Sequence, residues 1–347
     1  TVTIDTNKPI LSDANNLTSG DGKIPEYTNN TSPEYIFHST ENGTIQLYNY
    51  TNSHTISTRD SLNGNYTVTL EGLSPGTYDN INITLTDSAG NESDPWTIPI
   101  FHVDTNDPSL IDTPTMTSSS GFGWAKNGDN ITITLNTNEP IIELNAIIKC
   151  GVTILPASRI SYNLDDGNNP TASFTVDSEN GNVSVIEITM TDRAYNTITR
   201  QNLPFVSTIT VDTLKPVLSE RTPISTITNN PTYKFHSTES GIISLNNNYT
   251  FSPSNPSRDT DGNYTILLNL QHNRIYDDIE ITVTDDAGNE SSPLKINTFT
   301  LDTNDATVNN IVLYTNNNSG NFAKTDDSIY VEFNTNEEVN NPIVQFN

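Results

Sequence analysis

Asp5-Thr6-Asn7-Lys8-Pro9 stands near the start of the chain, and the same Asp-Thr-x-x-Pro peptide recurs at Asp104 and Asp212. A fourth copy begins at Asp302 and has Ala306 where the others have proline. The four aspartates lie 99, 108 and 90 residues apart. This spacing is too long for one unit of a solenoid and suits a small, independently folded domain. The peptide therefore predicts an array of tandem domains with an Asp-Thr-x-x-Pro linker between them.

The linkers divide the 347 residues into four segments: 1–104, 105–212, 213–302 and 303–347. We expect a complete domain in each of the first three segments and a partial domain in the fourth. Residues 1–5 read as the last strand of a preceding domain. Either the polypeptide continues past both ends, or a strand from a neighbouring subunit completes the last domain.

Two kinds of domain alternate along the chain. Tyr35-Ile36-Phe37-His38-Ser39-Thr40-Glu41 in the first segment matches Tyr233-Lys234-Phe235-His236-Ser237-Thr238-Glu239 in the third, at an offset of 198 residues. Asn136-Thr137-Asn138-Glu139 in the second segment matches Asn334-Thr335-Asn336-Glu337 in the fourth, at the same offset. The duplicated unit is a pair of unlike domains, type A followed by type B. Duplication of a pair favours a role in setting length over a single active site.

The secondary structure is predicted to be all-β. Residues 80–86, 130–135 and 278–283 alternate apolar with polar side chains and are rich in β-branched residues, which is typical of half-buried strands. Clusters of Gly, Pro and Asn separate these runs and supply turns. About seven short strands in each segment indicate an elongated array of immunoglobulin-like β-sandwiches.

A strand, a Thr-Asp-x-Ala-Gly-Asn turn, a second strand and then Asp-Thr-x-x-Pro follow one another in the first segment, and the third segment has the same order with Ala306 in place of the proline; the turns lie at residues 86–91 and 284–289. This combination resembles the bacterial and archaeal immunoglobulin-like repeats of large cell-surface adhesins, biofilm-associated proteins and surface-layer proteins. The resemblance implies an extracellular, structural or adhesive role. The second segment departs from the pattern because Tyr195 stands where the turn has glycine, which puts the geometry of that turn in question.

The chain is strongly acidic, with 42 Asp and Glu against 15 Lys and Arg and a net charge of −27. Such a charge repels nucleic acid and anionic membrane surfaces, so we expect neither as a partner. Two interpretations of the charge stay open, namely solubility and the binding of cations. The single cysteine, Cys150, excludes an intrachain disulfide and is expected to be a buried structural thiol.

Carboxylates from three distant stretches are expected to meet where the chain enters each domain. In an immunoglobulin-like sandwich the loop after strand B and the F–G loop lie at this end, close to the linker. Clustered anionic oxygens repel one another unless a cation lies among them, and oxygen ligands of loose geometry suit Ca²⁺. We therefore predict calcium sites at three junctions: Asp5, Glu41 and Asp87; Asp104, Glu139 and Asp192; and Asp212, Glu239 and Asp285.

The alternative is that these aspartates only cap turns. An aspartate at a turn often accepts hydrogen bonds from its own backbone, and Asp-Thr before proline suits an Asx-type turn. The chain has no Asp-x-Asp-x-Asp-Gly loop of the EF-hand kind, so the calcium prediction depends on the convergence of the three stretches.

No catalytic motif is found in the sequence. It contains no Gly-x-Ser-x-Gly peptide and no phosphate-binding loop, and its five histidines lie far apart, without a neighbouring cysteine. Trp96 and Trp124 are single aromatics in their segments, which is more typical of core or junction packing than of a sugar-binding platform.

These observations predict a non-enzymatic, extracellular repeat segment, a calcium-stiffened stalk of a microbial surface adhesin that contacts neighbouring domains of a longer chain. One alternative is a subunit of a surface layer, an extracellular filament or a virion fibre, in which identical subunits are partners. A second alternative is a carbohydrate-binding accessory region of a secreted enzyme.

Overall fold

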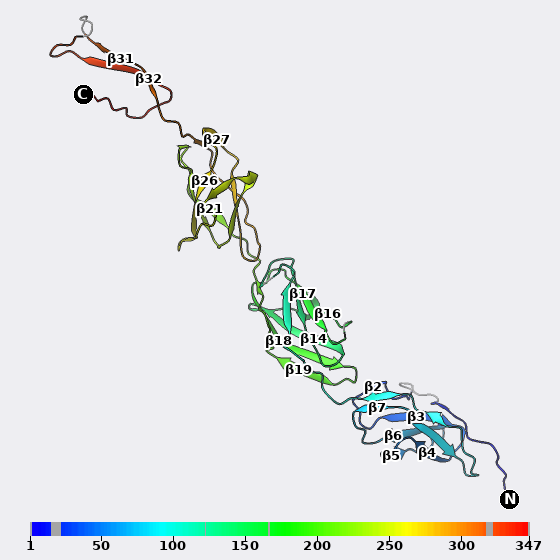
Figure 1. The fold of residues 1–347 in the computed structure, drawn as a ribbon. Helices are drawn as coiled ribbons and strands as arrows, with labels where there is room; N and C mark the ends of the chain where they lie inside the picture. The colour runs from blue at the N-terminus through cyan, green and yellow to red at the C-terminus, as the bar shows by residue number, and fades with distance from the viewer. Residues whose placement is uncertain (1, 15–21, 122, 166, 317–321, 346–347) are drawn as a thin grey trace. The chain divides into compact units, whose positions relative to one another are not determined.

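β-strands make up nearly all the regular structure of the computed structural model, which describes residues 2–14, 22–121, 123–165, 167–316 and 322–345 (Figure 1). Within these ranges the helical segments are two 3-10 turns, η1 (Ala157–Arg159) and η2 (Asn246–Asn248). No helix of the described ranges is long and apolar enough to cross a membrane. The chain divides into two compact units, Thr1–Thr213 and Leu214–Asn347. The first unit holds two sandwiches, and the second holds one sandwich followed by a hairpin.

The first sandwich packs a four-stranded sheet against a second layer. The four-stranded sheet has the order β1 (Leu11–Asp13), β3 (Glu34–Ser39), β6 (Asn65–Leu70), β5 (His54–Ile56). The second layer consists of two three-stranded sheets, β2 (Tyr27–Thr28), β10 (Phe101–Val103), β7 (Gly76–Tyr78), and β4 (Thr44–Tyr48), β8 (Asn82–Thr86), β9 (Trp96–Thr97). The four-stranded sheet corresponds to strands A, B, E and D of an immunoglobulin-like domain, in that order. In the second layer, β2 corresponds to A′ and β4 to C, while β7 and β8 together form F and β9 and β10 together form G.

Alternate residues of these strands form the core of the first sandwich. Phe37 and Val68 from one layer and Ile83 and Phe101 from the other are each fully buried. The ring of Phe37 stacks on that of Tyr66 with centroids 5.7 Å apart. Period-two burial is what the apolar-polar alternation of the sequence predicts, because successive side chains of a strand point to opposite faces.

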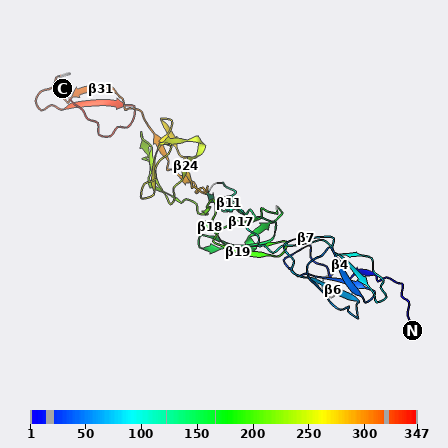
Figure 2. The same cartoon turned by 60° about the horizontal axis from the view of Figure 1, so that its bottom comes forward.

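The second sandwich has the same arrangement with longer strands. Its four-stranded sheet has the order β11 (Thr115–Ser118), β13 (Asn130–Thr134), β17 (Thr171–Thr175), β16 (Ser161–Asn163). Its second sheet has the order β12 (Trp124–Ala125), β20 (Thr210–Val211), β18 (Gly181–Asp192), β14 (Ile141–Cys150), β15 (Thr153–Ile154), with β19 (Thr197–Gln201) also paired to β18. Figure 2 shows β11, β17, β18 and β19 of this sandwich from another side.

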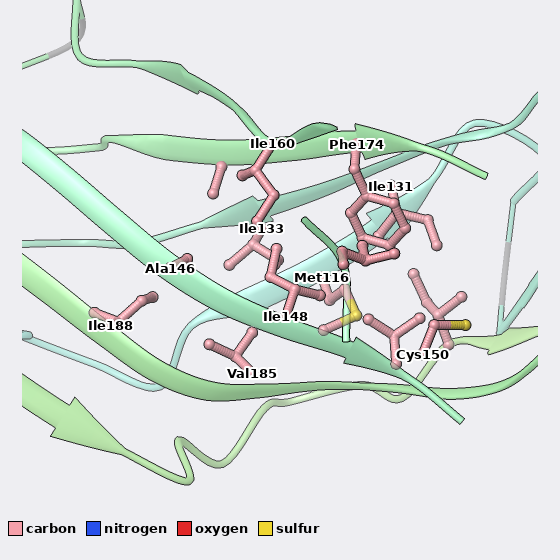
Figure 3. Packing of buried hydrophobic residues seen from close by; sticks show 14 of the residues in the cluster. Met116, Ile131, Ile133, Ala146, Ile148, Cys150, Ile160, Phe174, Val185 and Ile188 are labelled. Atoms are coloured by element: carbon pink, nitrogen blue, oxygen red, sulfur yellow. The ribbon is translucent and has the colours of Figure 1, made fainter. Parts of the chain in front are cut away.

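Aliphatic side chains dominate the core of the second sandwich, which lies between its two sheets (Figure 3). Ile133 and Phe174 of the four-stranded sheet face Ile148 and Val185 of the other sheet, and all four are buried. Cys150 has no exposed surface, and burial raises the pKa of its thiol to about 11. The expectation of a buried structural thiol is confirmed.

The third sandwich repeats the first. Its four-stranded sheet has the order β21 (Leu218–Thr222), β23 (Thr232–Ser237), β26 (Asn263–Asn269), β25 (Thr250–Ser252). Its second layer contains β22 (Ile227–Thr228), β30 (Phe299–Leu301), β27 (Arg274–Tyr276), and β24 (Ile242–Leu245), β28 (Glu280–Thr284), β29 (Leu294–Lys295). Phe235 stacks on Tyr264 at 5.5 Å, as Phe37 stacks on Tyr66 in the first sandwich. The prediction of tandem immunoglobulin-like β-sandwiches is confirmed.

The last segment is a single hairpin of β31 (Val308–Thr315) and β32 (Ile329–Thr335). Ile311, Leu313 and Ile329 each keep more than half of their surface exposed. These apolar side chains lack a facing sheet within the described residues. A two-stranded hairpin is at best marginally stable in water.

Hydrogen exchange should therefore separate this hairpin from the sandwich that precedes it. In the 347-residue chain, the amides of β31 and β32 should exchange at least about a hundredfold faster than those of β26 and β28, because a marginal hairpin opens locally at little cost. Exchange measured by mass spectrometry gives both rates in one sample. Equal protection of the two regions would contradict this expectation.

Candidate metal centres at the domain entrances

The sandwich topology brings three parts of the chain to one end of each domain. In the first sandwich, strand β3 ends at Ser39 just before Glu41, and β8 ends at Thr86 just before the turn that Asp87 opens. In the second sandwich, β13 ends shortly before Glu139, and β18 ends at Asp192. The linker aspartate lies beside these two loops because the chain enters the domain there.

The first set of predicted residues converges. Asp5, Glu41 and Asp87 each offer a carboxylate oxygen, and these oxygens lie within 4.8 Å of one another. Glu41 and Asp87 are partly or largely buried, whereas Asp5 is exposed. Asn91, at the end of the turn, donates from Nδ2 both to Oδ2 of Asp87 at 2.8 Å and to the backbone carbonyl of Asp5 at 3.2 Å.

The second set converges in a more buried place. The carboxylate oxygens of Asp104, Glu139 and Asp192 lie within 4.8 Å of one another, and Asp192 is only 1% exposed. Asn196 donates from Nδ2 to Oδ2 of Asp192 at 2.9 Å and to the backbone carbonyl of Asp104 at 2.9 Å. On the other side, the amide of Asp104 donates to the carbonyl of Thr28 in the first sandwich at 2.9 Å. The linker aspartate is therefore held from both domains.

The third predicted set divides over the two compact units. Asp212 is the second-last residue of the first unit, and its amide donates to the carbonyl of Ala125 at 2.8 Å. Glu239 and Asp285 belong to the second unit, and Asn289 donates from Nδ2 to Oδ2 of Asp285 at 2.9 Å. Glu239 and Asp285 thus have the local bonds of Glu41 and Asp87, and the amide of Asp212 is held as that of Asp104 is.

Two carboxyl groups of the first two sets have shifted pKa values. The pKa of Glu139 is raised, first by its burial and then by the negative charges of Asp104 and Asp192. The pKa of Asp87 is lowered, mainly because the side chain of Asn91 donates a hydrogen bond to the ionised form.

Among the described residues, no ion pair joins a Lys or Arg side chain to a carboxylate of the first two sets. The ion pairs found in the described parts of the chain are Lys8–Asp94, Lys23–Asp13, Arg159–Glu179 and Lys234–Asp259, and they include no carboxylate of the first two sets. Arg193 follows Asp192 directly in sequence, but its guanidinium lies over the ring of Tyr27, 5.7 Å from the centroid. The guanidinium that is nearest to Asp192 in sequence therefore interacts with an aromatic ring.

The linker aspartates Asp5 and Asp104 both cap a turn and belong to a carboxylate cluster. The amide of Asn7 donates to Oδ1 of Asp5, and the amide of Asn106 donates to Oδ1 of Asp104, each at 3.0 Å. These are the Asx-type bonds that the alternative interpretation predicts. Asp104 Oδ1 also accepts from Nδ2 of Asn106 at 3.2 Å. A carboxylate offers about four lone-pair sites, so these capping bonds leave acceptor capacity for a cation.

Asn91 and Asn196 are the participants that the sequence prediction missed. Both residues were identified only as parts of the turn motif. Their side chains in fact bridge the turn aspartate to the carbonyl of the linker. A signal was present in the sequence, because Asn is the last residue of the turn in Asp87-Ser88-Ala89-Gly90-Asn91 and also in Asp192-Arg193-Ala194-Tyr195-Asn196, even though the residue before it differs.

An arginine fixes the loop that bears the glutamate in the type A domains. Arg59 donates from Nε and Nη2 to the carbonyl of Ser39 at 3.0 and 2.8 Å, and from Nη2 to the carbonyl of Thr40 at 3.3 Å. Arg258 makes the same three bonds to Ser237 and Thr238. Ser39 Oγ also donates to the carbonyl of Glu41 at 2.9 Å. The guanidinium therefore holds the two peptides that precede the cluster glutamate.

The type B domain holds its glutamate through the equivalent hydroxyl. Thr137 Oγ1 donates to the carbonyl of Glu139 at 2.7 Å and lies 3.0 Å from the carbonyl of Asn168, and Thr137 is fully buried. This bond matches the one from the buried Ser39 Oγ to the carbonyl of Glu41 in type A. The two domain types thus share the hydroxyl bond to the glutamate, and the arginine clamp is an addition of the type A domains.

The turn of the second sandwich keeps its shape without glycine. Tyr195 itself adopts the left-handed conformation, with φ of 68°, where Gly90 and Gly288 have φ of 93° and 86°. The amide of Asp192 donates to the carbonyl of Asn196 at 3.1 Å, as that of Asp87 does to Asn91 at 3.0 Å. The ring of Tyr195 is 67% exposed, so it gains little packing in return for the backbone strain.

Comparison with known proteins agrees with this architecture. The chain is an all-β protein of tandem immunoglobulin-like domains. Residues 3–105 match the family model described as bacterial Ig-like domain, which confirms the resemblance for the first sandwich. No match is found among curated proteins.

Three bacterial proteins are among the solved structures to which the chain is similar. The Escherichia coli adhesin FdeC is 12% identical, with 84% of this chain and 96% of that chain covered and a TM-score of 0.35. Invasin, a bacterial integrin-binding protein, is 13% identical, with 94% and 67% covered and a TM-score of 0.35. InvD of Yersinia pseudotuberculosis is 13% identical, with 86% and 98% covered and a TM-score of 0.30.

Replacing Arg59 with Gln should loosen the loop that carries Glu41. The variant loses hydrogen bonds from a charged donor to two carbonyls, so the exchange free energy of the amides of Ser39 and Thr40 should fall by about 1 kcal/mol. Hydrogen exchange of the full chain measures this change. Arg221→Gln is the matched control, because Arg221 is an exposed arginine on β21. Unchanged protection in Arg59→Gln would show that the clamp does not hold the loop.

Replacing Tyr195 with Gly should relax its turn. Removing a side chain from a left-handed position relieves roughly 1 kcal/mol of strain, so the amide of Asn196 should become better protected from exchange. The converse variant Gly90→Ala should lower the protection of Asn91 by a similar amount. A Cβ at Gly90 would meet nothing within 4 Å, so backbone conformation alone is tested there. Opposite changes in the two variants are expected, and changes of one sign would refute the explanation.

Proposed function

We propose that this chain is a non-enzymatic, extracellular repeat segment, a stalk of a microbial surface adhesin whose domain entrances bind Ca²⁺. The observation that carries the proposal is the convergence of three carboxylates from the linker, the loop after strand B and the F–G turn. The linker carbonyl is held beside them by Asn91 in the first domain and by Asn196 in the second. The extracellular, adhesive part of the proposal is supported by the bacterial Ig-like domain match of residues 3–105 and by the tandem repeats.

The donor set suits calcium. It consists of carboxylate oxygens with a backbone carbonyl nearby and contains neither His nor Cys, which soft transition metals prefer. Asp104, Glu139 and Asp192 would hold the ion at the second entrance, and Asp5, Glu41 and Asp87 would hold it at the first. Calcium supplies there the positive charge that three neighbouring carboxylates require.

The proposed mechanism is mechanical. Asp104 belongs to the linker, whereas Glu139 and Asp192 belong to the body of the second domain. An ion bound by all three ties the linker to the domain and removes rotational freedom between neighbouring sandwiches. An array stiffened in this way holds a recognition module at a distance from the cell.

Two other functions have less support. Assembly into a surface layer, filament or virion fibre requires contacts between copies in addition to the cation sites. A carbohydrate-binding role requires an exposed aromatic platform, but the indole of Trp96 donates to Tyr35 at 2.8 Å and packs against the core. The carboxylate clusters contribute to neither function directly, so the stalk is the function that they favour.

Small-angle scattering tests the stiffening. With calcium present, the full chain should give a longer maximum dimension and a narrower distribution of sizes than after removal of calcium with EDTA. Glu139→Gln should show a smaller response than the native chain, and Glu143→Gln, an exposed glutamate on β14, should respond like the native chain. Scattering curves that EDTA leaves unchanged would refute the calcium-stiffened stalk.

The raised pKa of Glu139 gives a second test, in which the direction of the change in stability is defined. Without calcium, a raised pKa means that ionising Glu139 costs stability, and this cost appears as the pH rises through that pKa. Glu139→Gln should then be more stable than the native second sandwich at pH 7, and the difference should vanish below about pH 4, where Glu is protonated. With saturating calcium the order should reverse at pH 7, because the variant loses a ligand.

Cys150 reports this stability locally. The thiol lies in the core of the second sandwich and has no exposed surface, so a thiol reagent reaches it when that sandwich unfolds. The urea concentration at which Cys150 becomes reactive measures the stability of this domain alone. A variant that is less stable than the native chain both with and without calcium would contradict the electrostatic account.

A further inference from the structure

The second sandwich exposes a neutral, hydroxyl-rich face on the outer side of its four-stranded sheet. Along β13 the buried residues Ile131 and Ile133 alternate with outward-facing Thr132 and Thr134. The neighbouring strands alternate in the same way, so that their small polar residues point outward. We call this outer side of β11, β13, β17 and β16 the hydroxyl face.

Strand register places these side chains in rows. Thr134 pairs with Thr115 on one side and Thr171 on the other. Asn163 continues this row on β16. The neighbouring row, two residues along each strand, consists of Thr117, Thr132, Ser173 and Ser161. No residue of either row carries a charge.

The equivalent faces of the type A domains are different. In the first sandwich, Glu34 of β3 lies opposite Thr69 in the corresponding sheet. In the third sandwich, Lys234 of β23 lies opposite Thr265 and forms an ion pair with Asp259 at 3.6 Å. The neutral face is thus a property of the second sandwich and does not follow from the fold alone.

We propose that the hydroxyl face is a lateral contact surface for a second copy of this chain. The chain carries a net charge of −27, so two copies repel one another wherever their acidic surfaces meet. The hydroxyl face can approach its own copy without burying a charge. Hydroxyl and amide side chains each donate and accept hydrogen bonds, so two identical faces complement one another across a two-fold axis.

The size of the face sets the strength of the contact. Four strands about 4.8 Å apart and two rows about 7 Å apart cover roughly 270 Å² on each copy. Two copies bury about 540 Å² together, well below the roughly 1,200 Å² of a stable interface. The contact is therefore weak between free chains and accumulates where many copies are held side by side, because tethering raises their effective concentration. This inference does not depend on calcium at the domain entrances.

Crosslinking between copies tests the proposal in the full chain. Ser173→Cys places a thiol in the middle of the hydroxyl face by a nearly isosteric change, and Thr132→Cys places one on the adjacent strand. Thr199→Cys is the matched control, because Thr199 is an exposed threonine on β19 of the opposite sheet. The native chain controls for Cys150, which is fully buried.

A short bis-maleimide should form dimers of Ser173→Cys and Thr132→Cys about tenfold faster than dimers of Thr199→Cys, because the contact raises the local concentration of facing thiols. Added salt should increase the difference by screening the repulsion between chains. Placing Thr134→Asp beside Ser173→Cys should return the rate to that of the control.

Other outcomes overturn the proposal. Equal rates for the two faces would show that the hydroxyl face makes no contact between copies. Modification of Ser173→Cys by a maleimide should not respond to a neutral polysaccharide such as dextran. Protection by dextran at a fixed protein concentration, without faster dimer formation, would assign the face to a glycan instead of a second copy.

Discussion

The β-sandwich topology is the constraint on which the other features of this chain depend. Strand B and strand F run in opposite layers, yet the end of B and the turn after F lie at the same end of the domain, where the linker arrives. Asp104 and Asp212 are each fixed to the preceding domain by a bond that extends the parallel strand pairing, since the amide of Asp104 donates to Thr28 and that of Asp212 donates to Ala125. In the first two domains, the fold therefore brings the carboxylates of the linker, the loop after strand B and the turn after strand F close to one another.

The clusters differ in how they are supported. A buried hydroxyl holds the backbone of the glutamate in both sandwiches, and in the first sandwich Arg59 also clamps the peptides before Glu41. The second cluster is also the more buried, with Asp192 almost inaccessible to solvent. Burial strengthens the repulsion among carboxylates and equally strengthens their attraction for a cation. Of the first two entrances, the second should therefore depend more on the ion.

Much of this arrangement could be predicted from the sequence because its signals are periodic and repeated. The alternation in residues 130–135 predicts strand β13, and the 198-residue offset relates Phe37 to Phe235 before their cores are seen. The side-chain bridges of Asn91 and Asn196 could not be predicted, because their second partner is a backbone carbonyl whose position depends on the path of the linker. The hydrogen bonds of Arg59 likewise could not be predicted, because no local sequence pattern links an arginine to acceptors twenty residues away. Tyr195 shows that a turn imposed by its neighbours can force a left-handed conformation on an unfavourable residue.

Calcium binding to the full chain, measured by isothermal titration calorimetry at neutral pH, tests the central claim most directly. The account predicts saturable binding with a dissociation constant no weaker than about 1 mM, the range of extracellular calcium modules. It also predicts that Asp192→Asn removes one class of sites, while Asp177→Asn, an exposed aspartate of the same domain, leaves binding unchanged. Absence of saturable binding at millimolar calcium, or equal binding by both variants, would contradict the account and leave the aspartates as turn caps.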